Sequence, residues 1–400
     1  MKKGWQTKTL GDVLEKTETV NPLQSPSVEF DYIDVSSVSN TTFEIQETQR
    51  LKEKDAPSRA RKLVRTNDII FATIRPTLQR IAVVPEHLDK QVCSTGYFVL
   101  RPKLGIDHRF VIYSLFTENF VGQMESLQKG ASYPAVTDGY VRAQEIPVPP
   151  LAEQQRIVGV LDEAFEGLAT AKANAEKNLQ NARALFESHL QSVFTQRDPG
   201  WVEKPLGEVC EFENGDRGKN YPNRNEYVET GIPWINTGHI QPDGTLSMEE
   251  MNFITREKFD SLRSGKIQPR DLVYCLRGAT LGKTALVDPL TEGAVASSLV
   301  ILRPSSLLDG SFLYFFLTSP AGQGLIKGFE NGAAQPNLGA KSVAKYPISF
   351  PKLPEQREIA DSLIELREQT QRLARLYEQK LAALEVLKKS LLHQAFTGEL

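Results

Sequence analysis

The strongest constraint on this chain of 400 residues is that its second half repeats the pattern of its first half. The matching stretches keep their order through residues 1–200 and 201–400, which indicates a duplicated unit rather than a chance similarity. The matches include Gly4-Trp5 with Gly200-Trp201, Leu10-Gly11 with Leu206-Gly207, Asp68-Ile69 with Asp271-Leu272, Leu100-Arg101-Pro102 with Leu302-Arg303-Pro304, Gly130-Ala131 with Gly332-Ala333, and Glu153-Gln154 with Glu355-Gln356.

Each copy divides into two parts of different character. The first part mixes short β-branched and aromatic runs with glycine, proline and asparagine turn signals, which is typical of a domain with both helices and strands. After a proline-marked boundary, each copy continues with a stretch rich in Ala, Leu, Glu, Lys and Gln that predicts one long helix. We therefore predict an α+β protein with a globular domain at 1–150, a helix at 151–197, a second globular domain at 198–350 and a second helix at 351–400.

The two helices have apolar residues at alternating steps of three and four, which is the pattern of a coiled-coil seam. The first seam is rich in Ala and the second in Leu, so small side chains of one helix can pack against large ones of the other. The predicted seam residues are Ile157, Leu161, Leu168 and Leu185 in the first helix, and Ile359, Leu363, Leu373, Leu384 and Leu387 in the second.

The connectivity predicts that these helices run antiparallel. The second globular domain joins the end of the first helix to the start of the second, and the ends of a domain usually lie close together. The expected register places Asn178 opposite Thr370 and Ala182 opposite Leu366. A helix of ~40 residues spans ~60 Å, so the expected molecule has a globular domain at each end of an antiparallel coiled coil, with pseudo-twofold, circular symmetry.

Composition restricts the class of protein but does not reveal a partner. No stretch approaches 18 apolar residues and no secretory leader is recognisable, so we expect no membrane segment and a cytoplasmic location. Cys93, Cys210 and Cys275 lie far apart, which argues against a disulfide framework and a cysteine-based zinc site. The formal net charge of −3 gives no sign of a nucleic-acid ligand.

The sequence offers little support for catalysis. The stretch Gly278–Thr284 resembles a phosphate-binding loop but is one residue short, and the matching stretch of the first copy contains no glycine. The five histidines have no metal-ligand spacing, and His239 corresponds to Ser37 in the other copy. We expect no cofactor and no catalytic residue, although a nucleotide-binding enzyme stays open as an alternative that dialysis against ATP would test.

The distribution of charge favours binding of nucleic acid more than the net charge does. Residues 50–65 hold seven basic and two acidic side chains, and basic residues recur at the same place in the second copy. Basic loops that also carry aromatic residues suit phosphate neutralisation and contacts to base edges. The alternative is an ordinary solvated charged surface. Tyr32 and Trp234 are more typical of core residues than of base contacts.

Several motifs together resemble the DNA-specificity subunit of type I restriction–modification systems. They are the strand at Tyr32 and Trp234, the turns after Asp68 and Asp271, the Leu281-Gly282-Lys283-Thr284-Ala285 stretch, the Gly332–Asn337 segment, the proline-rich lead into Leu-x-Glu-Gln-x-x-Ile in both copies, and the terminal Phe-Thr-Gly-Glu-Leu. The resemblance covers the whole chain. The first copy departs from the family pattern at Tyr133-Pro134-Ala135 and at Gln79.

This resemblance implies a non-catalytic subunit with two target-recognition domains, each of which reads one half of an asymmetric bipartite site in double-stranded DNA. It implies that the helices set the spacing and dock two modification (methyltransferase) subunits, to which restriction subunits can be added. Methyl transfer, DNA translocation and cleavage would then belong to these partners. The alternative is a coiled-coil adaptor without sequence-specific DNA binding, which a DNA-binding assay with a methyltransferase partner would separate.

For the DNA-binding interpretation we expect two kinds of contact. Basic residues in the first domain would hold the DNA backbone, and Arg75 and Gln79 are candidate readers of base edges. The candidate DNA-binding residues are Arg59, Arg61, Lys62, Arg65, Arg75, Gln79 and Arg80 in the first domain, and Arg217, Lys219, Arg224, Arg277 and Lys283 in the second.

Overall fold

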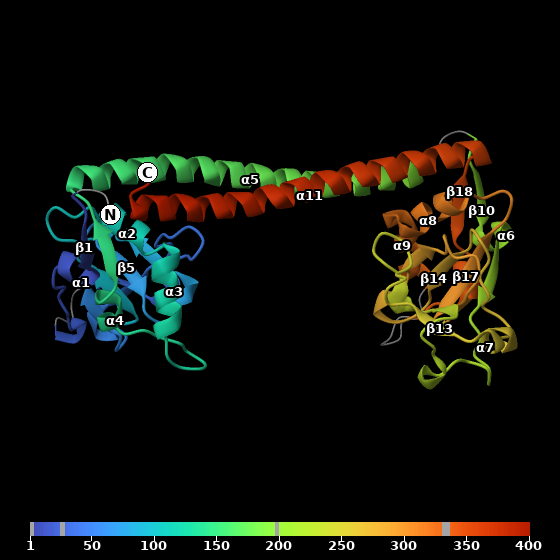
Figure 1. Cartoon of the computed structure of the whole chain (residues 1–400), viewed down its shortest axis with the longest axis horizontal. Coiled ribbons are helices and arrows are strands. Elements are labelled where there is room, and N and C mark those ends of the chain that lie inside the picture. The colour runs from blue at the N-terminus through green and yellow to red at the C-terminus, as the bar shows by residue number, and fades with distance from the viewer. Residues whose placement is uncertain (1–3, 25–28, 197–199, 330–336) are drawn as a thin grey trace. The chain divides into compact units, whose positions relative to one another are not determined.

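The computed structural model describes residues 4–24, 29–196, 200–329 and 337–400. The chain forms two compact units, one made of Met1–Glu176 with Gln379–Leu400 and the other of Lys177–Glu378. Each unit therefore combines one globular domain with a portion of each of the two long helices, α5 (Leu151–Thr195) and α11 (Leu353–Thr397) (Figure 1).

The globular part of the first unit is built from two main sheets and a short strand pair. The strands are β1 (Gln6–Thr9), β2 (Glu29–Ile33), β3 (Gln49–Lys52), β4 (Ala60–Leu63), β5 (Ile69–Ala72), β6 (Ile81–Val83), β7 (Val92–Ser94), β8 (Tyr97–Leu100) and β9 (Glu145–Val148). The sheet orders are β3-β2-β7-β4, β6-β5-β8 and β1-β9. The helices are α1 (Leu10–Val13), α2 (His108–Ser114), α3 (Glu118–Leu127) and α4 (Asp138–Arg142).

The central strand β5 is buried on both faces because successive side chains of a strand point to opposite sides. Ile69 and Phe71 join a core with helical residues such as Phe120, whereas Ile70 and Ala72 pack in a second core on the other face of the strand. A strand that is apolar at every position is typical of this fully covered environment.

The globular part of the second unit repeats this frame with a different strand arrangement. Its strands are β10 (Val202–Pro205), β11 (Cys210–Asn214), β12 (Ile232–Ile235), β13 (Asn252–Ile254), β14 (Leu272–Cys275), β15 (Thr284–Leu286), β16 (Ala294–Val295), β17 (Leu299–Pro304) and β18 (Pro347–Phe350). They form sheets in the orders β11-β17-β14-β15, β13-β12-β16 and β10-β18. The helices are α6 (Leu206–Val209), α7 (Arg256–Ser261), α8 (Gly310–Thr318), α9 (Pro320–Phe329) and α10 (Ala340–Val343).

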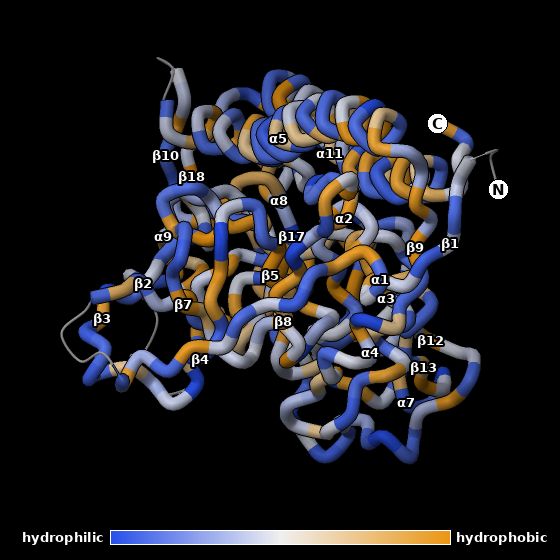
Figure 2. The backbone as a smooth tube through the Cα atoms, turned by 90° about the vertical axis from the view of Figure 1, so that its left-hand side faces the viewer, coloured by the Kyte–Doolittle hydropathy of each residue, from blue (hydrophilic) through white to orange (hydrophobic). Residues whose placement is uncertain are grey.

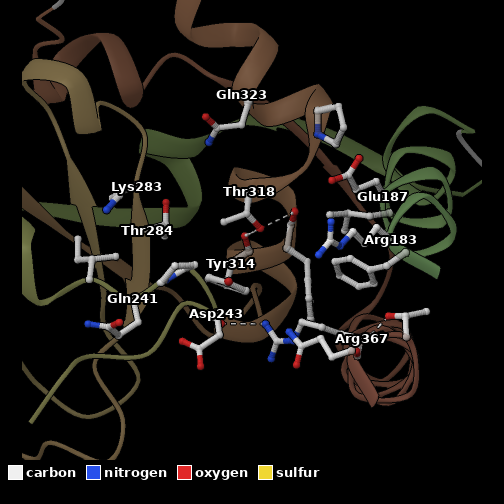
Figure 3. Close-up of a pocket in the computed structure, with 18 of the residues that line it drawn as sticks. Arg183, Glu187, Gln241, Asp243, Lys283, Thr284, Tyr314, Thr318, Gln323 and Arg367 are labelled. Carbon is white, nitrogen blue, oxygen red and sulfur yellow. Dashed lines mark hydrogen bonds between the residues drawn. The ribbon is translucent and has the colours of Figure 1, made fainter. Parts of the chain in front are cut away.

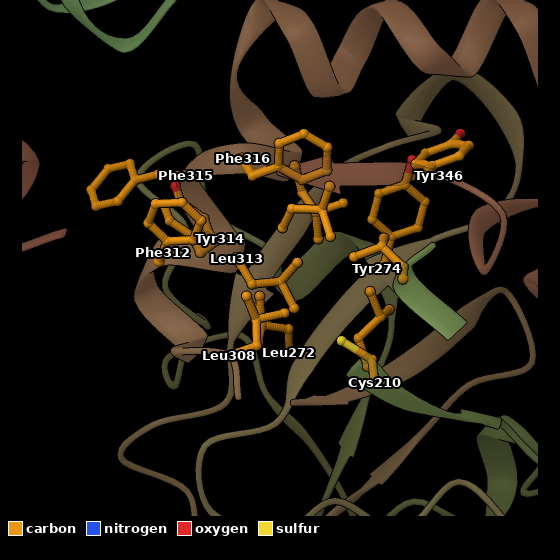
Figure 4. Packing of buried hydrophobic residues seen from close by; sticks show 14 of the residues in the cluster. Cys210, Leu272, Tyr274, Leu308, Phe312, Leu313, Tyr314, Phe315, Phe316 and Tyr346 are labelled. Carbon is orange, nitrogen blue, oxygen red and sulfur yellow. The ribbon is translucent and has the colours of Figure 1, made fainter. Parts of the chain in front are cut away.

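Strand β14 occupies the place of β5, and its side chains divide between two cores in the same way. Leu272 and Tyr274 pack with Phe312 and Leu313 of α8 (Figure 4). Val273 and Cys275 belong to a second core, which includes Ile235 of β12 and Val295 of β16. The two cores of the second unit therefore repeat the layered arrangement of the first. Hydrophobic residues gather along these strands, whereas they alternate with hydrophilic ones along α5 and α11 (Figure 2).

A buried ion pair connects two of the repeated motifs in each unit. Arg101 donates from Nε and Nη2 to the two carboxylate oxygens of Asp68, at 2.8 and 2.7 Å, and from Nη1 to Glu18 at 2.6 Å. In the second unit, Arg303 donates to both carboxylate oxygens of Asp271 at 2.9 Å. The Asp and the Leu-Arg-Pro motifs, which the sequence shows separately, are thus the two halves of one bidentate contact.

The repeated Glu-Gln motif anchors each long helix to its globular domain. The Gln154 side chain accepts from Asp107 N–H at 2.9 Å and donates to the carbonyls of Pro149 and Gly105, at 2.8 and 3.3 Å. Gln356 makes the equivalent three bonds in the second unit, to Asp309, Pro351 and Leu307. Both glutamines are buried, so their amides satisfy backbone groups that water cannot reach.

The helices run antiparallel within each unit. In the first unit, Arg156 donates to the Leu400 carbonyl at 2.8 Å and Lys172 forms an ion pair with Glu385 at 2.7 Å. None of the helices in the described residues is sufficiently long and apolar to span a membrane.

The register of the helix pair differs from the predicted one. In the second unit, Arg183 pairs with Glu378 at 2.7 Å, whereas the predicted alignment would place Arg183 opposite Glu365. In the first unit, Lys172 pairs with Glu385 at 2.7 Å, whereas the predicted alignment would place Lys172 opposite Leu376. The seam pattern does not contain this information, because many registers satisfy it equally well.

The seam residues also separate into groups that the alternating spacing did not distinguish. Ile157, Leu161 and Leu363 are buried, and Leu168, Ile359 and Leu384 are half-buried. The predictions were wrong for three residues, which are 53 %, 38 % and 46 % exposed: Leu185, Leu373 and Leu387. The buried positions Ala182 and Leu190, with half-buried Phe186 between them, follow steps of four. A helix with 3.6 residues per turn drifts away from a strict 3.5 repeat over several turns.

We predict that Asp68→Asn destabilises the first unit by about 3–5 kcal/mol, because Arg101 loses its buried carboxylate partner. Denaturant unfolding, followed by hydrogen exchange in peptides of each unit, measures the effect. Arg50→Ala is the control, because Arg50 is 58 % exposed and its ion pairs with Glu29 and Asp31 are screened by water. A loss as small as that of the control would contradict a structural role for the buried pair.

A histidine in the second unit replaces a serine of the first as a turn cap. His239 Nδ1 accepts from Asn236 N–H at 3.2 Å, as Ser37 Oγ accepts from Asp34 N–H at 3.1 Å. Burial lowers the pKa of His239 below its ordinary value, although the neighbouring Glu250 acts in the opposite direction. The folded state therefore holds the neutral imidazole, with Nδ1 as the acceptor.

We predict that the second unit loses stability as the pH falls below about 6.5, because the unfolded chain takes up a proton on His239 before the folded chain does. Thermal unfolding between pH 7.5 and 5 measures this dependence. His239→Ser supplies the cap of the first unit without a titratable ring, so its pH dependence should be flatter. An unchanged dependence would show that another group is responsible.

Candidate nucleic-acid interface

The structure divides the basic residues predicted for the first domain into two groups. Lys62 donates to the Tyr97 carbonyl at 2.6 Å and to Asp138 at 2.8 Å, Arg65 pairs with Glu18 at 2.6 Å, and Arg80 donates to the Val38 carbonyl at 2.6 Å. The Lys62 side chain is only 17 % exposed. Lys62 and Arg80 are thus engaged inside the domain and Arg65 forms a surface ion pair, whereas the structure gives no ion pair to Arg59, Arg75, Arg61 or Gln79 among the described residues.

Backbone hydrogen bonds bring Arg59 and Arg75 to one edge of the first domain. Thr95 N–H donates to the Arg59 carbonyl at 2.8 Å, and the next residue, Gly96, accepts from Thr73 N–H at 2.8 Å. Arg75 N–H donates to the Pro134 carbonyl at 2.7 Å. Three loops that are distant in the sequence therefore form one continuous surface.

The loop that contains Pro134 adds an aromatic residue that the sequence analysis did not select. Tyr133 is 71 % exposed, and the Arg75 guanidinium lies over its ring with 5.0 Å between Cζ and the ring centroid. Arg75 also donates to the Ser132 carbonyl at 3.3 Å. The signal that could have identified Tyr133 was its departure from the Gln found at the matching place, Gln335.

The second domain has an equivalent edge built on the same frame. Leu276 N–H donates to the Ser298 carbonyl and accepts from Leu338 N–H at its own carbonyl, both at 2.9 Å, and Arg217 donates to the Ser297 carbonyl at 3.2 Å. The segment Gly332–Pro336, which matches Gly130–Pro134 in the sequence, lies outside the described part of the chain. All five predicted residues of this domain are exposed: Arg217, Lys219, Arg224, Arg277 and Lys283.

A buried carboxylate orders the loop that carries Arg217 and Lys219. Asp216 accepts from Gly218 N–H at 2.7 Å and from Arg263 N–H at 2.9 Å. These backbone donors lower the pKa of Asp216 to about 2, since they stabilise the charged carboxylate. The basic side chains on either side of Gly218 are thus presented from an ordered turn.

The stretch that resembles a phosphate-binding loop serves a hairpin. Cys275 N–H donates to the Lys283 carbonyl at 2.8 Å, and Gly278 and Gly282 supply the positive φ angles of the turn between β14 and β15. Within the described ranges, His, Cys, Asp and Glu side chains form no group of three that could hold a metal ion.

A groove of about 1020 Å³ lies between this hairpin and the helices of the second unit (Figure 3). Lys283 and Gln241 line its domain side, and Arg183 and Arg367 line its helix side. The Arg367 guanidinium donates to the Asp243 carbonyl at 3.0 Å and lies over the rings of Tyr314 and Phe315. Lys283 therefore faces the groove, and Arg367 connects α11 to the domain.

Comparison with known proteins agrees with this duplicated architecture. The sequence pattern of the type I restriction modification DNA specificity domain matches twice, at residues 2–179 and 199–384. The chain belongs to this family, and it is therefore a DNA-specificity subunit of the type I restriction–modification class.

Individual relatives support the same assignment. The chain is 23% identical over 313 residues to the type I restriction enzyme MjaVIII specificity subunit of Methanocaldococcus jannaschii, covering 74% of this chain and 71% of that protein. It is 23% identical over 328 residues to the type I restriction enzyme EcoKI specificity subunit of Escherichia coli K12, covering 77% of this chain and 69% of that protein. The crystal structure of the HsdS subunit from Thermoanaerobacter tengcongensis aligns with a TM-score of 0.72 and 29% identity, covering 100% of this chain and 98% of that one. A structure of a type I R-M system aligns with a TM-score of 0.79 at the same identity, covering 100% and 99%.

Proposed function

We propose that each globular domain reads one half of a bipartite site in double-stranded DNA through its loop edge. The observation that carries this proposal is that equivalent edges, held by the same backbone contacts, present different side chains in the two units. Arg59 and Arg75 lie at the first edge, while Arg217 and Arg277 lie at the second. A shared frame with different readers suits an asymmetric target.

The chain contributes recognition rather than chemistry in this proposal. Methyl transfer and DNA cleavage belong to the modification and restriction subunits of the complex, and the long helices set the distance between the two half-sites. The net charge of −3 is compatible with this role, because a few positioned cations suffice for base contacts and the partner subunits supply further phosphate contacts.

The ion-paired residues need a different role from the one that the sequence suggested. Because Lys62, Arg65 and Arg80 are engaged within the domain, we assign them to the architecture of the edge. Arg59 and Arg61 are left as the phosphate contacts of the first domain. Arg277 and the loop with Arg217, Lys219 and Arg224 fulfil this role in the second, and Lys283 faces the groove beside it.

We predict that Arg59→Ala weakens the binding of all DNA sequences equally and reduces the salt slope of the binding constant by about 0.9, the value for one phosphate contact. Titrations of the assembled methyltransferase complex at several salt concentrations measure the slope. Arg50→Ala is the control, since it removes a charge from β3, the strand at the opposite side of its sheet from β4. A changed sequence preference at constant salt slope would contradict a phosphate contact.

The helices also expose apolar residues that suit a protein partner. Leu185, Leu373 and Leu376 are at least 38 % exposed on the helix portions of the second unit, and Val386 and Leu387 on that of the first. Exposed leucines and valines on long helices are typical of surfaces that another helix covers. We assign them to the docking of one modification subunit on each unit, in agreement with the duplication.

We predict that Leu376→Glu reduces the affinity for the modification subunit roughly tenfold or more without unfolding the chain, because Leu376 is 53 % exposed and a charge there would be buried on docking. Analytical ultracentrifugation of mixed subunits measures the stoichiometry and affinity. Gln379→Glu adds the same charge at an exposed polar position of the same helix. Equal effects of the two variants would show that the apolar surface is not the contact.

A further inference from the structure

The turn after the central strand has two left-handed positions in both units. In the first unit they are Arg75, with φ of 51°, and Gln79, with φ of 52°. In the second unit they are Gly278, with φ of 75°, and Gly282, with φ of 84°. A non-glycine residue is disfavoured in this region because its Cβ approaches the following carbonyl oxygen.

The hydrogen bonds show that these positions are equivalent. The bond from Ala72 N–H to the Arg80 carbonyl closes the first hairpin at 3.0 Å, and the bond from Cys275 N–H to the Lys283 carbonyl closes the second at 2.8 Å. Gln79 and Gly282 each precede the residue that supplies the accepting carbonyl. The sequence match of this stretch with Gly278–Thr284 and the backbone contacts both pair Arg75 with Gly278 and Gln79 with Gly282.

Arg75 and Gln79 therefore occupy positions where glycine satisfies the same turn at no steric cost. Strained backbone positions are found most often at functional sites, where the side chain is needed for another purpose. The Arg75 side chain is exposed, and its contacts within the domain are the Tyr133 ring and one hydrogen bond to the Ser132 carbonyl. Both contacts are at the exposed surface, so burial of the side chain does not explain why arginine occupies a left-handed position.

The chemistry of these two side chains indicates what they contact. Arginine makes two parallel hydrogen bonds to O6 and N7 of guanine, and glutamine makes two to N6 and N7 of adenine. Both sit at the ends of one short 3₁₀ turn, Pro76–Leu78, at the loop edge of the domain. The ring of Tyr133 lies under the Arg75 guanidinium and restricts the plane of this group before any base is bound.

We propose that Arg75 and Gln79 are the base-reading pair of the first domain, which selects one G·C and one A·T pair in the first half-site, and that Tyr133 is the positioning residue for Arg75. This inference rests on the proposed function and specifies its chemistry. The glycines of the second unit exclude the same readout there, so the second half-site is read by other residues.

The first test is sequence selection from a randomised DNA library by the full chain assembled with its modification subunits. Gln79→Gly should lose the preference for the A·T pair at one position of the first half-site and leave the second half-site unchanged. It should also raise the midpoint of thermal unfolding by about 2 °C, because glycine relieves the left-handed strain. Arg75→Lys should lower discrimination at one G·C position about tenfold, since lysine cannot form the bidentate contact.

A matched control separates strain relief from recognition. Asn67 is also left-handed, with φ of 67°, but it lies in the turn before β5. Asn67→Gly should raise the unfolding midpoint as Gln79→Gly does and leave the selected sequences unchanged. A change of selected sequence in Asn67→Gly would overturn the assignment, because stability alone would then alter specificity.

Tyr133 is tested by comparing two variants. Tyr133→Phe keeps the ring and should retain the G·C preference, whereas Tyr133→Ala should reduce that preference about threefold with an unchanged unfolding midpoint. If Tyr133→Ala weakened the binding of all DNA sequences equally, the positioning role of Tyr133 would be overturned. If the wild-type complex selects no sequence at all, the proposed function fails. If it selects a bipartite site that Arg75→Lys and Gln79→Gly leave intact, this inference alone fails.

Discussion

The junction between each globular domain and its long helix depends on one buried glutamine amide. Gln154 and Gln356 each bind a loop N–H and two carbonyl oxygens, at the point where the chain leaves the last strand and begins the helix. The N–H that each glutamine binds belongs to Asp107 or Asp309, whose carboxylate in turn caps α2 or α8. An amide is suited to this position because it donates and accepts at once. The same side chain thus connects the start of the helix to the end of the last strand and to the loop before α2 or α8.

The buried frame of each domain and its exposed loop edge are subject to different physical constraints. The bidentate Asp–Arg pair is repeated in both units because burial makes an unpaired charge very costly. The edge residues are exposed and have no such constraint, so the two units could diverge there while the frame stayed the same. This combination suits the proposed function, in which a common frame presents different side chains to the two half-sites.

Some features of the site could be predicted from the sequence, and others could not. The basic character of residues 50–65 and the importance of the turn after Asp68 were visible in the duplicated pattern. The sequence did not show which of these side chains are free to contact DNA, because Lys62 and Arg65 pair with Asp138 and Glu18, which are far away in the sequence. Tyr133 lies next to Arg75 because the fold joins their loops, through hydrogen bonds from Arg75 to the Pro134 and Ser132 carbonyls.

The sequence by itself determined the duplication, the α+β domains, the two long helices and the family, because these depend on local periodicity and on motifs that recur in order. The tertiary structure alone decided the register of the helices, as the failed alignment of Arg183 and the exposure of Leu185 show. A heptad-like pattern permits many registers, and the one that the chain adopts is visible only in contacts between the helices, such as Lys172 with Glu385. The left-handed state of Arg75 and Gln79 follows from how the hairpin closes, and in the sequence its only sign is the glycine at each matching place of the second copy.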